Sequence, residues 1–128
     1  MTRIPDFVTH VMELLREFGP VTPKPMFGCW ALYRDDVFFA IVRHDVLYLK
    51  ADEANRGEFE ARGLGPFIYE MKTGEAITLD YHEAPGEALE EAGEMARWAK
   101  SAYAAALRKR AAKPPPRKRA KRTAPKQA

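Results

Sequence analysis

Three apolar segments in the first half of the chain are separated by very short polar breaks. The segments are residues 29–33, 37–42 and 46–49, and the breaks contain Asp35-Asp36 and His44-Asp45. Two-residue loops join antiparallel neighbours, whereas a parallel connection needs about a dozen residues or more. The spacing therefore predicts an antiparallel meander. Segment 37–42 is apolar at consecutive positions, so we expect it to be the central strand.

Helical patterns precede and follow this meander. Apolar residues recur at helical spacing from Pro5 until Gly19-Pro20, which predicts an opening helix. Asp52 has the side chain of a helix cap and predicts a short helix that Gly63 and Gly65 terminate. After Pro85, an alanine-rich amphipathic pattern predicts the longest helix, from Gly86 to about Leu107.

Two further segments complete the predicted sheet. Residues 67–71 and 76–81 alternate and flank a loop containing Gly74, which predicts a second hairpin. Residues 21–25 contain two prolines, so they can form only a connection or an edge strand. The element order predicts an α+β two-layer sandwich, with one antiparallel sheet of about five to six strands and helices on one face.

Charge divides the chain at residue 107. The 128 residues contain 21 Lys and Arg and 18 Asp and Glu, but residues 108–128 hold ten of the bases and no acid. Residues 1–107 keep eleven bases and eighteen acids, a net charge of −7, and the tail carries +10. We expect residues 1–107 to form one domain. Residues 108–128, with prolines at 114–116 and few apolar side chains, should be disordered.

Several short motifs occur in an order that resembles the N-terminal domain of the TfoX/Sxy family. They are Met26-Phe27-Gly28, residues 32–35, Phe39-Ala40, residues 47–52, Phe67-x-Tyr69 and residues 81–85, and the similarity extends from about residue 6 to residue 107. The resemblance implies a sheet-and-helix fold of the secretion-chaperone type, similar in shape to small YjbR-like DNA-binding proteins of bacteria. It also implies a structural role for the motif residues, which are Met26, Phe27, Gly28, Tyr33, Leu49, Lys50, Phe67, Tyr69, Tyr81 and Pro85.

Full-length members of that family are regulators of natural competence and carry a second, C-terminal domain. We expect the basic tail, residues 108–128, to stand in its place in this chain. A flexible cationic segment neutralises phosphates and releases counterions, so the tail predicts nucleic-acid binding without sequence preference. The residues expected to carry it are Arg108, Lys109, Arg110, Lys113, Arg117, Lys118, Arg119, Lys121, Arg122 and Lys126. Two alternatives are a protein-binding adaptor with a solubilising tail, and a tail that folds back on the acidic body.

The aromatic side chains of the meander have two interpretations. Together they could form a base-stacking face, but core packing is the favoured interpretation because a two-layer domain must fill one sheet face. Alternation places Trp30 and Leu32 on one side of their strand. Cys29, Ala31 and Tyr33 lie on the other side, and we expect this set, which has the smaller side chains, to lie beneath a helix. Trp30 would then be half exposed and would indicate a homodimer or partner surface. The aromatic residues concerned are Trp30, Tyr33, Phe38, Phe39 and Tyr48.

The sequence indicates no catalytic, metal or cofactor motif. His10, His44 and His82 lack metal-ligand spacing, and Cys29 is expected to be a small core residue. The acidic residues near the start of the last helix are explained by the helix dipole. We therefore expect a non-enzymatic protein without a cofactor. No apolar stretch approaches a membrane span, and the N-terminus lacks a signal-peptide pattern, which favours a cytoplasmic location.

Overall fold

The computed structural model describes residues 4–26 and 28–112, and within them a six-stranded antiparallel sheet in the order β1-β2-β3-β4-β6-β5. The strands are β1 (Thr22–Met26), β2 (Cys29–Arg34), β3 (Val37–Arg43), β4 (Val46–Lys50), β5 (Pro66–Glu70) and β6 (Ala76–Glu83). The predicted meander is confirmed, with β3 inside the sheet. Of the two alternatives for the proline-containing segment, the structure shows the edge strand, β1, where a missing N–H donor is tolerated.

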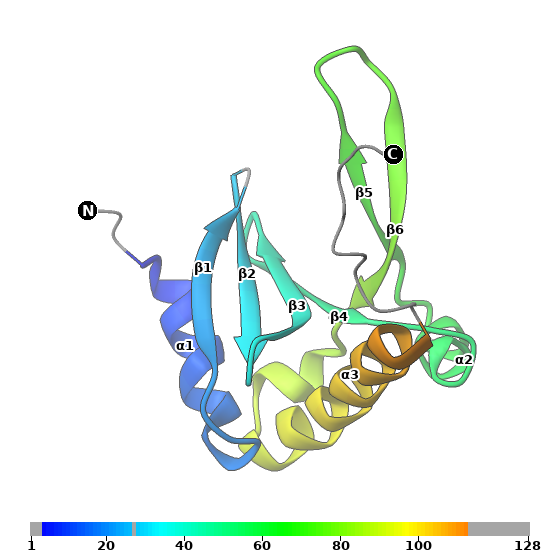
Figure 1. The fold of residues 1–128 in the computed structure, drawn as a ribbon. Helices are drawn as coiled ribbons and strands as arrows, with labels where there is room; N and C mark the ends of the chain where they lie inside the picture. Colours follow the sequence, from blue (N-terminus) through cyan, green and yellow to red (C-terminus); the bar gives the residue numbers. More distant parts are fainter. Residues whose placement is uncertain (1–3, 27, 113–128) are drawn as a thin grey trace, which may run out of the picture.

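Helices cover one face of the sheet, so the predicted α+β two-layer sandwich is confirmed. They are α1 (Asp6–Leu14), α2 (Arg56–Ala61) and α3 (Ala92–Ala112), with short 3₁₀ turns at η1 (Leu15–Glu17) and η2 (Gly86–Leu89). Figure 1 shows α1 and α3 on the same side of β2, β3 and β4, while the β5–β6 hairpin projects away from the helices. The main core lies between this helical layer and the sheet, and includes Leu32, Phe39, Phe59 and Trp98.

The final helix differs from the sequence prediction at both ends. Residues 86–89 form the separate 3₁₀ turn η2, and α3 begins only at Ala92. At its other end, α3 continues past Leu107 to Ala112. Arg108, Lys109 and Arg110 are therefore helical, and the expectation of disorder is wrong for residues 108–112. Alanine, arginine and lysine have high helix propensity, and the first helix-breaking residue is Pro114.

Asp52 does not cap α2. The helix begins at Arg56 after Asn55, and the Asp52 carboxylate instead accepts hydrogen bonds from the backbone N–H groups of Ala54 and Asn55. This arrangement is an Asx turn, in which a short carboxylate satisfies backbone donors ahead of the helix. It leaves the rest of the carboxylate available to a distant partner, Arg108.

The expected facing of β2 is also wrong. Leu32 is fully buried in the main core and Trp30 packs partly buried against it, while Cys29 belongs to a second cluster. The set with the larger side chains, Trp30 and Leu32, therefore faces the helices. The physical reason lies in α3, whose inward face carries only small side chains at many positions and leaves room for large ones from the sheet. These positions include Ala92, Ala96, Ala99, Ala102 and Ala106.

Candidate functional site

The sheet face opposite the helices carries a second, smaller apolar cluster that is rich in aromatic rings. Its buried members are Cys29, Ile41, Phe67 and Tyr81, and its partly buried members are Phe38, Tyr48, Tyr69 and Leu79. Of the aromatic residues that the sequence left ambiguous, Phe39 lies in the main core. Tyr33, Phe38 and Tyr48 are only partly buried and belong to this opposite face. We call it the aromatic face.

Three rings of the aromatic face form a continuous row. Tyr33 and Phe38 stack with their centroids 5.3 Å apart and their planes at 28°, and Phe38 lies 5.3 Å from Tyr81 at 33°. Tyr33 and Phe38 are register partners on β2 and β3, on either side of the Asp35-Asp36 turn. Phe38 and Tyr81 lie on β3 and β6, on either side of β4, so the sheet order brings these sequence-distant rings together.

Lys50 ends this row of rings. It is the last residue of β4, the register partner of Tyr81, and shares a face with Tyr48 by strand alternation. Only 4% of the residue is exposed, and its Nζ lies 4.9 Å from the centroid of the Tyr81 ring. The pKa of Lys50 is lowered to about 8, chiefly by burial and then by the neighbouring Lys109, against the raising effect of Asp80 and Asp52.

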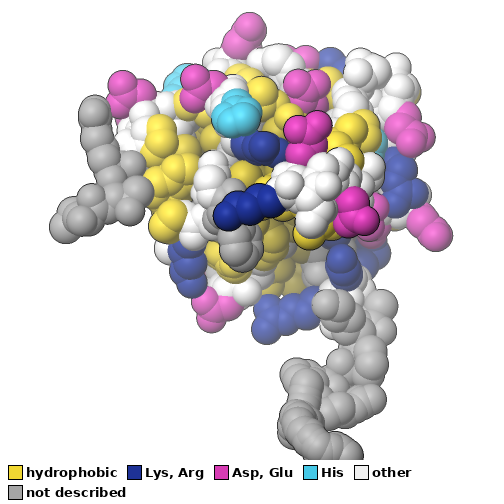
Figure 2. All heavy atoms as spheres, turned by 90° about the horizontal axis from the view of Figure 1, so that it is seen from above, with side chains coloured by type: hydrophobic (Ala, Val, Ile, Leu, Met, Phe, Trp, Pro, Cys, Tyr) yellow, Lys and Arg dark blue, Asp and Glu magenta, His cyan; other side chains and the backbone are white. Residues whose placement is uncertain are grey.

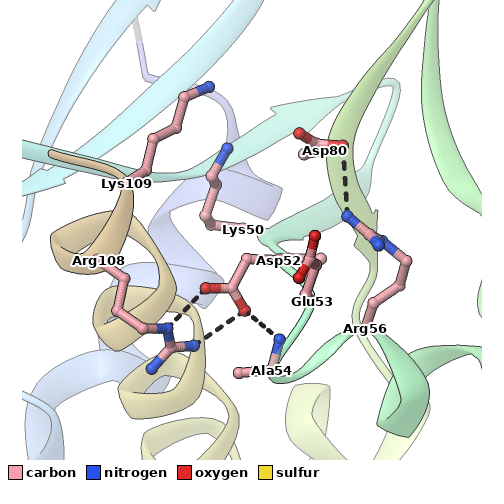
Figure 3. A pocket seen from close by; sticks show the side chains of 9 residues that line it. Lys50, Asp52, Glu53, Ala54, Arg56, Asp80, Arg108 and Lys109 are labelled. Carbon is pink, nitrogen blue, oxygen red and sulfur yellow. Dashed lines mark hydrogen bonds and ion pairs between the residues drawn. The ribbon is translucent and has the colours of Figure 1, made fainter. Parts of the chain in front are cut away.

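Two hollows meet at Lys50 and Lys109. The first encloses about 560 Å³ between the end of β4, the segment after it, β6 and the end of α3, and Figure 3 shows the side chains that line it. The second encloses about 400 Å³ on the aromatic face. It is lined by Asp36, Val37, Phe38, Lys50, Leu79, Tyr81, Ala106, Lys109 and Arg110.

The arginines that line the first hollow form ion pairs, whereas its lysines do not within the described residues. Arg108 pairs with Asp52 at 2.6 Å, and Arg56 pairs with Asp80 at 3.8 Å. In Figure 3 the side chains of Lys50 and Lys109 extend to one side of the hollow, while Arg108 turns the other way toward Asp52. Within residues 4–26 and 28–112, no carboxylate lies within ion-pair distance of either lysine. The two hollows therefore share two ammonium groups that have no paired acid in the described part of the chain.

Further cations flank the aromatic face. The Lys24 Nζ lies 4.8 Å from the centroid of the Tyr33 ring, and the Arg43 guanidinium lies 5.7 Å and 5.6 Å from the Phe67 and Tyr69 rings. Figure 2 shows Lys and Arg side chains set among hydrophobic ones on the side viewed from above, with several acidic side chains toward the edges. Cations next to exposed aromatic surface are suited to a ligand with both negative charge and flat apolar groups.

The motif residues converge more than the sequence indicated. Tyr33, Lys50, Phe67, Tyr69 and Tyr81 all lie on or beside the aromatic face. The other motif residues lie elsewhere: Leu49 in the main core, Pro85 buried before η2, Met26 partly buried at the end of β1, and Gly28 in the left-handed region with φ 80°. Phe27 lies outside the described residues.

The predicted nucleic-acid-binding residues are described only in part. Lys109 and Arg110 are exposed in the last turns of α3 and line the second hollow, whereas Arg108 is engaged by Asp52. The remaining seven lie outside the described residues, and they are Lys113, Arg117, Lys118, Arg119, Lys121, Arg122 and Lys126. The proximity of Lys50 and Lys109 was not predicted from the sequence. Strand alternation was the available signal, because it puts Lys50 on the same face as Tyr48.

The histidines and the cysteine have individual surroundings. His82 lies within β6, which extends to Glu83 beyond the predicted strand end at residue 81, and its Nδ1 is 2.8 Å from the carbonyl oxygen of Leu64. The Nε2 of His10 is 3.0 Å from the carbonyl oxygen of Leu89. Burial raises the pKa of the Cys29 thiol, which keeps it protonated. Among the described residues, no cluster of three or more His, Cys, Asp or Glu could hold a metal ion.

Comparison of the chain with known protein families gives one match. Residues 13–106 match the model of the TfoX N-terminal domain. The chain belongs to this family. The match includes every strand and ends within α3, so the aromatic face and Lys50 lie inside the family domain, whereas Arg108, Lys109 and Arg110 lie beyond it. No curated protein matches the chain closely enough to count as a relative.

In the described part of the chain, no helix is both long and apolar enough to cross a membrane.

Proposed function

We propose that this member of the TfoX N-terminal domain family is a non-enzymatic, cytoplasmic regulatory protein that binds nucleic acid without sequence preference through its basic C-terminal segment. The observation that carries the proposal is the exposed pair Lys109 and Arg110, which have no acidic partner among the described residues. They are the second and third of the ten cations in residues 108–128. Such a segment supplies phosphate contacts and counterion release.

The acidic body makes the location of these cations informative. Residues 1–107 carry a net charge of −7, which would repel a polyanion. Asp52 neutralises Arg108, and the next residues, Lys109 and Arg110, begin the unpaired positive charge at the end of α3. Nucleic acid would therefore approach the protein at this end rather than over its acidic surface.

The experiment compares the full chain with a full-length variant whose tail is neutralised at Arg117→Gln, Lys118→Gln, Arg119→Gln, Lys121→Gln and Arg122→Gln. Binding to a labelled duplex is measured by fluorescence anisotropy over a range of salt concentrations. The full chain should show a slope of log affinity against log salt of about −0.9 for each phosphate contacted. The variant should bind much more weakly and with a shallower slope. Unchanged affinity in the variant, or binding that salt does not weaken, would refute the proposal.

A second candidate function, a protein-binding adaptor, is supported by a different region. The hairpin of β5 and β6 exposes Ile68, Met71 and Ile77 at 50%, 38% and 43% of their surfaces, and β5 lies at the edge of the sheet. An edge strand with exposed apolar side chains can accept an added strand from an extended peptide. Capture of a protein that survives both nuclease treatment and tail neutralisation, and that is lost in Ile68→Lys, would favour the adaptor.

A further inference from the structure

Lys50 occupies a position that costs stability. A lysine with only 4% of its surface exposed and no carboxylate within ion-pair distance among the described residues is an unpaired buried cation. Its neighbour Lys109 adds repulsion between like charges. Proteins break such packing rules mainly at functional sites, where a ligand supplies the missing partner. The missing partner of two adjacent ammonium groups is an anion.

The surroundings of the lysine pair restrict the anion further. The second hollow is lined by two chemically different sets of side chains, the apolar or aromatic Phe38, Leu79 and Tyr81 and the cationic Lys50, Lys109 and Arg110. Asp36 is the one acidic side chain among the described residues that line it. Its volume of about 400 Å³ falls in the range of roughly 300–1,000 Å³ that is usual for small-ligand pockets. A ligand that matches this lining carries both a flat apolar ring and a negatively charged group.

We propose that this hollow binds one nucleotide unit of single-stranded nucleic acid, with its phosphate between Lys50 and Lys109 and its base against Phe38. The proposal rests on the proposed function and specifies the preferred form of nucleic acid. Bases stack on aromatic side chains in single strands, because every base has an accessible face there. In a duplex the faces of the bases are covered by neighbouring base pairs. The aromatic side chains of the hollow would then have no base to stack against.

The row of rings extends the proposed path. From Phe38 it continues to Tyr33, where the Lys24 ammonium lies 4.8 Å from the ring centroid. The rings of Tyr81, Phe38 and Tyr33 thus follow one another as a stacking surface for bases. A cation stands at each end of this row, Lys50 beside Tyr81 and Lys24 beside Tyr33, where it can meet a phosphate. At the other end, the path reaches Lys109 and Arg110, from which the basic tail continues. The tail would hold the strand by charge, and the aromatic face would distinguish single strands from duplexes.

The test uses the full chain with a labelled short oligothymidylate and a duplex of equal length, both measured by fluorescence anisotropy. Lys50→Met removes the ammonium while keeping an unbranched apolar chain, and Phe38→Leu removes the ring. Each should weaken oligothymidylate binding by roughly tenfold, the effect of losing one stacked base or one phosphate contact. Duplex affinity should change by less than about twofold, because the tail contacts its phosphates without the hollow.

Three controls make the result specific. Lys100→Met removes an exposed positive charge from α3 outside both hollows and should change neither affinity. Phe38→Tyr keeps a ring and should retain most of the single-strand affinity. Titration of oligothymidylate into the isotopically labelled wild-type chain should shift the amide signals of Phe38, Lys50 and Tyr81, a readout that does not depend on any variant folding.

The outcomes separate this inference from the proposed function. If Lys50→Met and Phe38→Leu reduce oligothymidylate and duplex binding equally, or no more than Lys100→Met does, the single-strand site is wrong. Amide shifts confined to residues after Ala112 would also overturn it. In either case the proposed function still stands if the tail-neutralised variant loses duplex binding. Conversely, a tail-neutralised variant that keeps duplex affinity while the Lys50 and Phe38 variants lose single-strand affinity would refute the first proposal alone.

Discussion

The carboxylate of Asp52 accepts two hydrogen bonds from the guanidinium of Arg108, at 2.6 Å from Nε and 2.9 Å from Nη2. This bidentate pair joins the segment after β4 to the end of α3, and the same carboxylate also orders the turn before α2. The hydrogen bond from Arg108 is the main cause that lowers the pKa of Asp52. The pair holds the helix end, and with it Lys109, beside Lys50.

Replacing Asp52 with Asn should loosen the end of α3. Asn can still accept a hydrogen bond from the Ala54 N–H but loses the charged pair, so we expect a loss of about 1 kcal/mol in the free energy of unfolding for this partly exposed site. Amide exchange should accelerate in the last turns of α3. Because the folded pKa of Asp52 is lowered, its contribution is present above the ordinary carboxyl pKa and disappears as the pH falls through the lowered one.

Urea unfolding at several pH values checks this expectation, with Glu58→Gln as a control that removes an exposed carboxylate from α2. The difference in the free energy of unfolding between Asp52→Asn and the wild type should become smaller as the pH falls. A constant difference down to low pH would contradict the role given to the ion pair.

Lys50→Met should stabilise the free protein at neutral pH. Lys50 faces Tyr81 and Asp80 of β6, Asp52 after β4 and Lys109 of α3, and its pKa of about 8 lies below the ordinary 10.5. Between these values the unfolded chain binds more protons, so the stability of the wild type rises with pH. Below pH 8 the full cost of the buried ammonium remains, and removing it should add about 2 kcal/mol.

The gain from Lys50→Met should therefore shrink as the pH rises from 8 toward 10.5, the window set by the two pKa values. Denaturant unfolding of both proteins across this window measures it, and Lys100→Met should show no comparable trend. A stability difference that is the same at both ends of the window would show that the lysine is not strained by burial.

The turn between β3 and β4 offers a stabilising substitution. His44 and Asp45 both adopt left-handed backbone conformations, with φ of 51° and 60°. A two-residue turn of this kind favours glycine at its second position. Asp45→Gly should raise the free energy of unfolding by about 0.5–1 kcal/mol, whereas Asp45→Ala should lower it because an L side chain without a polar atom disfavours this region. Thermal unfolding of the two variants should move in opposite directions. A shared direction would argue against backbone strain as the cause.

Trp98 should be the most costly side chain of α3 to truncate. It is 2% exposed, lies 5.3 Å from Phe59 between ring centroids, and is flanked by the guanidinium groups of Arg62 and Arg97. Trp98→Ala should cost about 3–5 kcal/mol through the cavity it leaves. Its indole Nε1 has no hydrogen-bond partner among the described residues. Trp98→Phe removes that buried donor and should cost less than about 2 kcal/mol. Equal losses for the two variants, measured by urea unfolding, would disprove the second expectation.

Local patterns accounted for much of the fold. Two-residue breaks forced the antiparallel meander, and the prolines at positions 23 and 25 restricted β1 to an edge, because both constraints act within a few bonds of the backbone. Asp52 shows where local reasoning stopped. A short acid ahead of a helix has the chemistry of a cap, but the choice between capping and pairing with Arg108 depended on a partner far along the chain.

The sequence was less informative about which face of the sheet the helices cover. Alternation correctly separates Trp30 and Leu32 from Cys29, and Tyr48 and Lys50 from Leu49, but it carries no information about which set meets the helices. That choice followed from the packing volume that the alanines of α3 leave open. The cluster on the opposite face arose because β6 pairs with both β4 and β5, which brings Tyr81 beside Phe38 and Lys50.

The amino-acid sequence alone determined the strand order within the meander, the separation of an acidic body from a cationic C-terminal segment, and the family resemblance, because each depends on neighbours in the chain or on charge totals. Tertiary structure alone decided that Asp52 pairs with Arg108 and that Lys50 and Lys109 meet beside a row of rings. The physical reason is that long-range packing and ion pairing set those contacts, and their free energies depend on which surfaces the folded chain brings together.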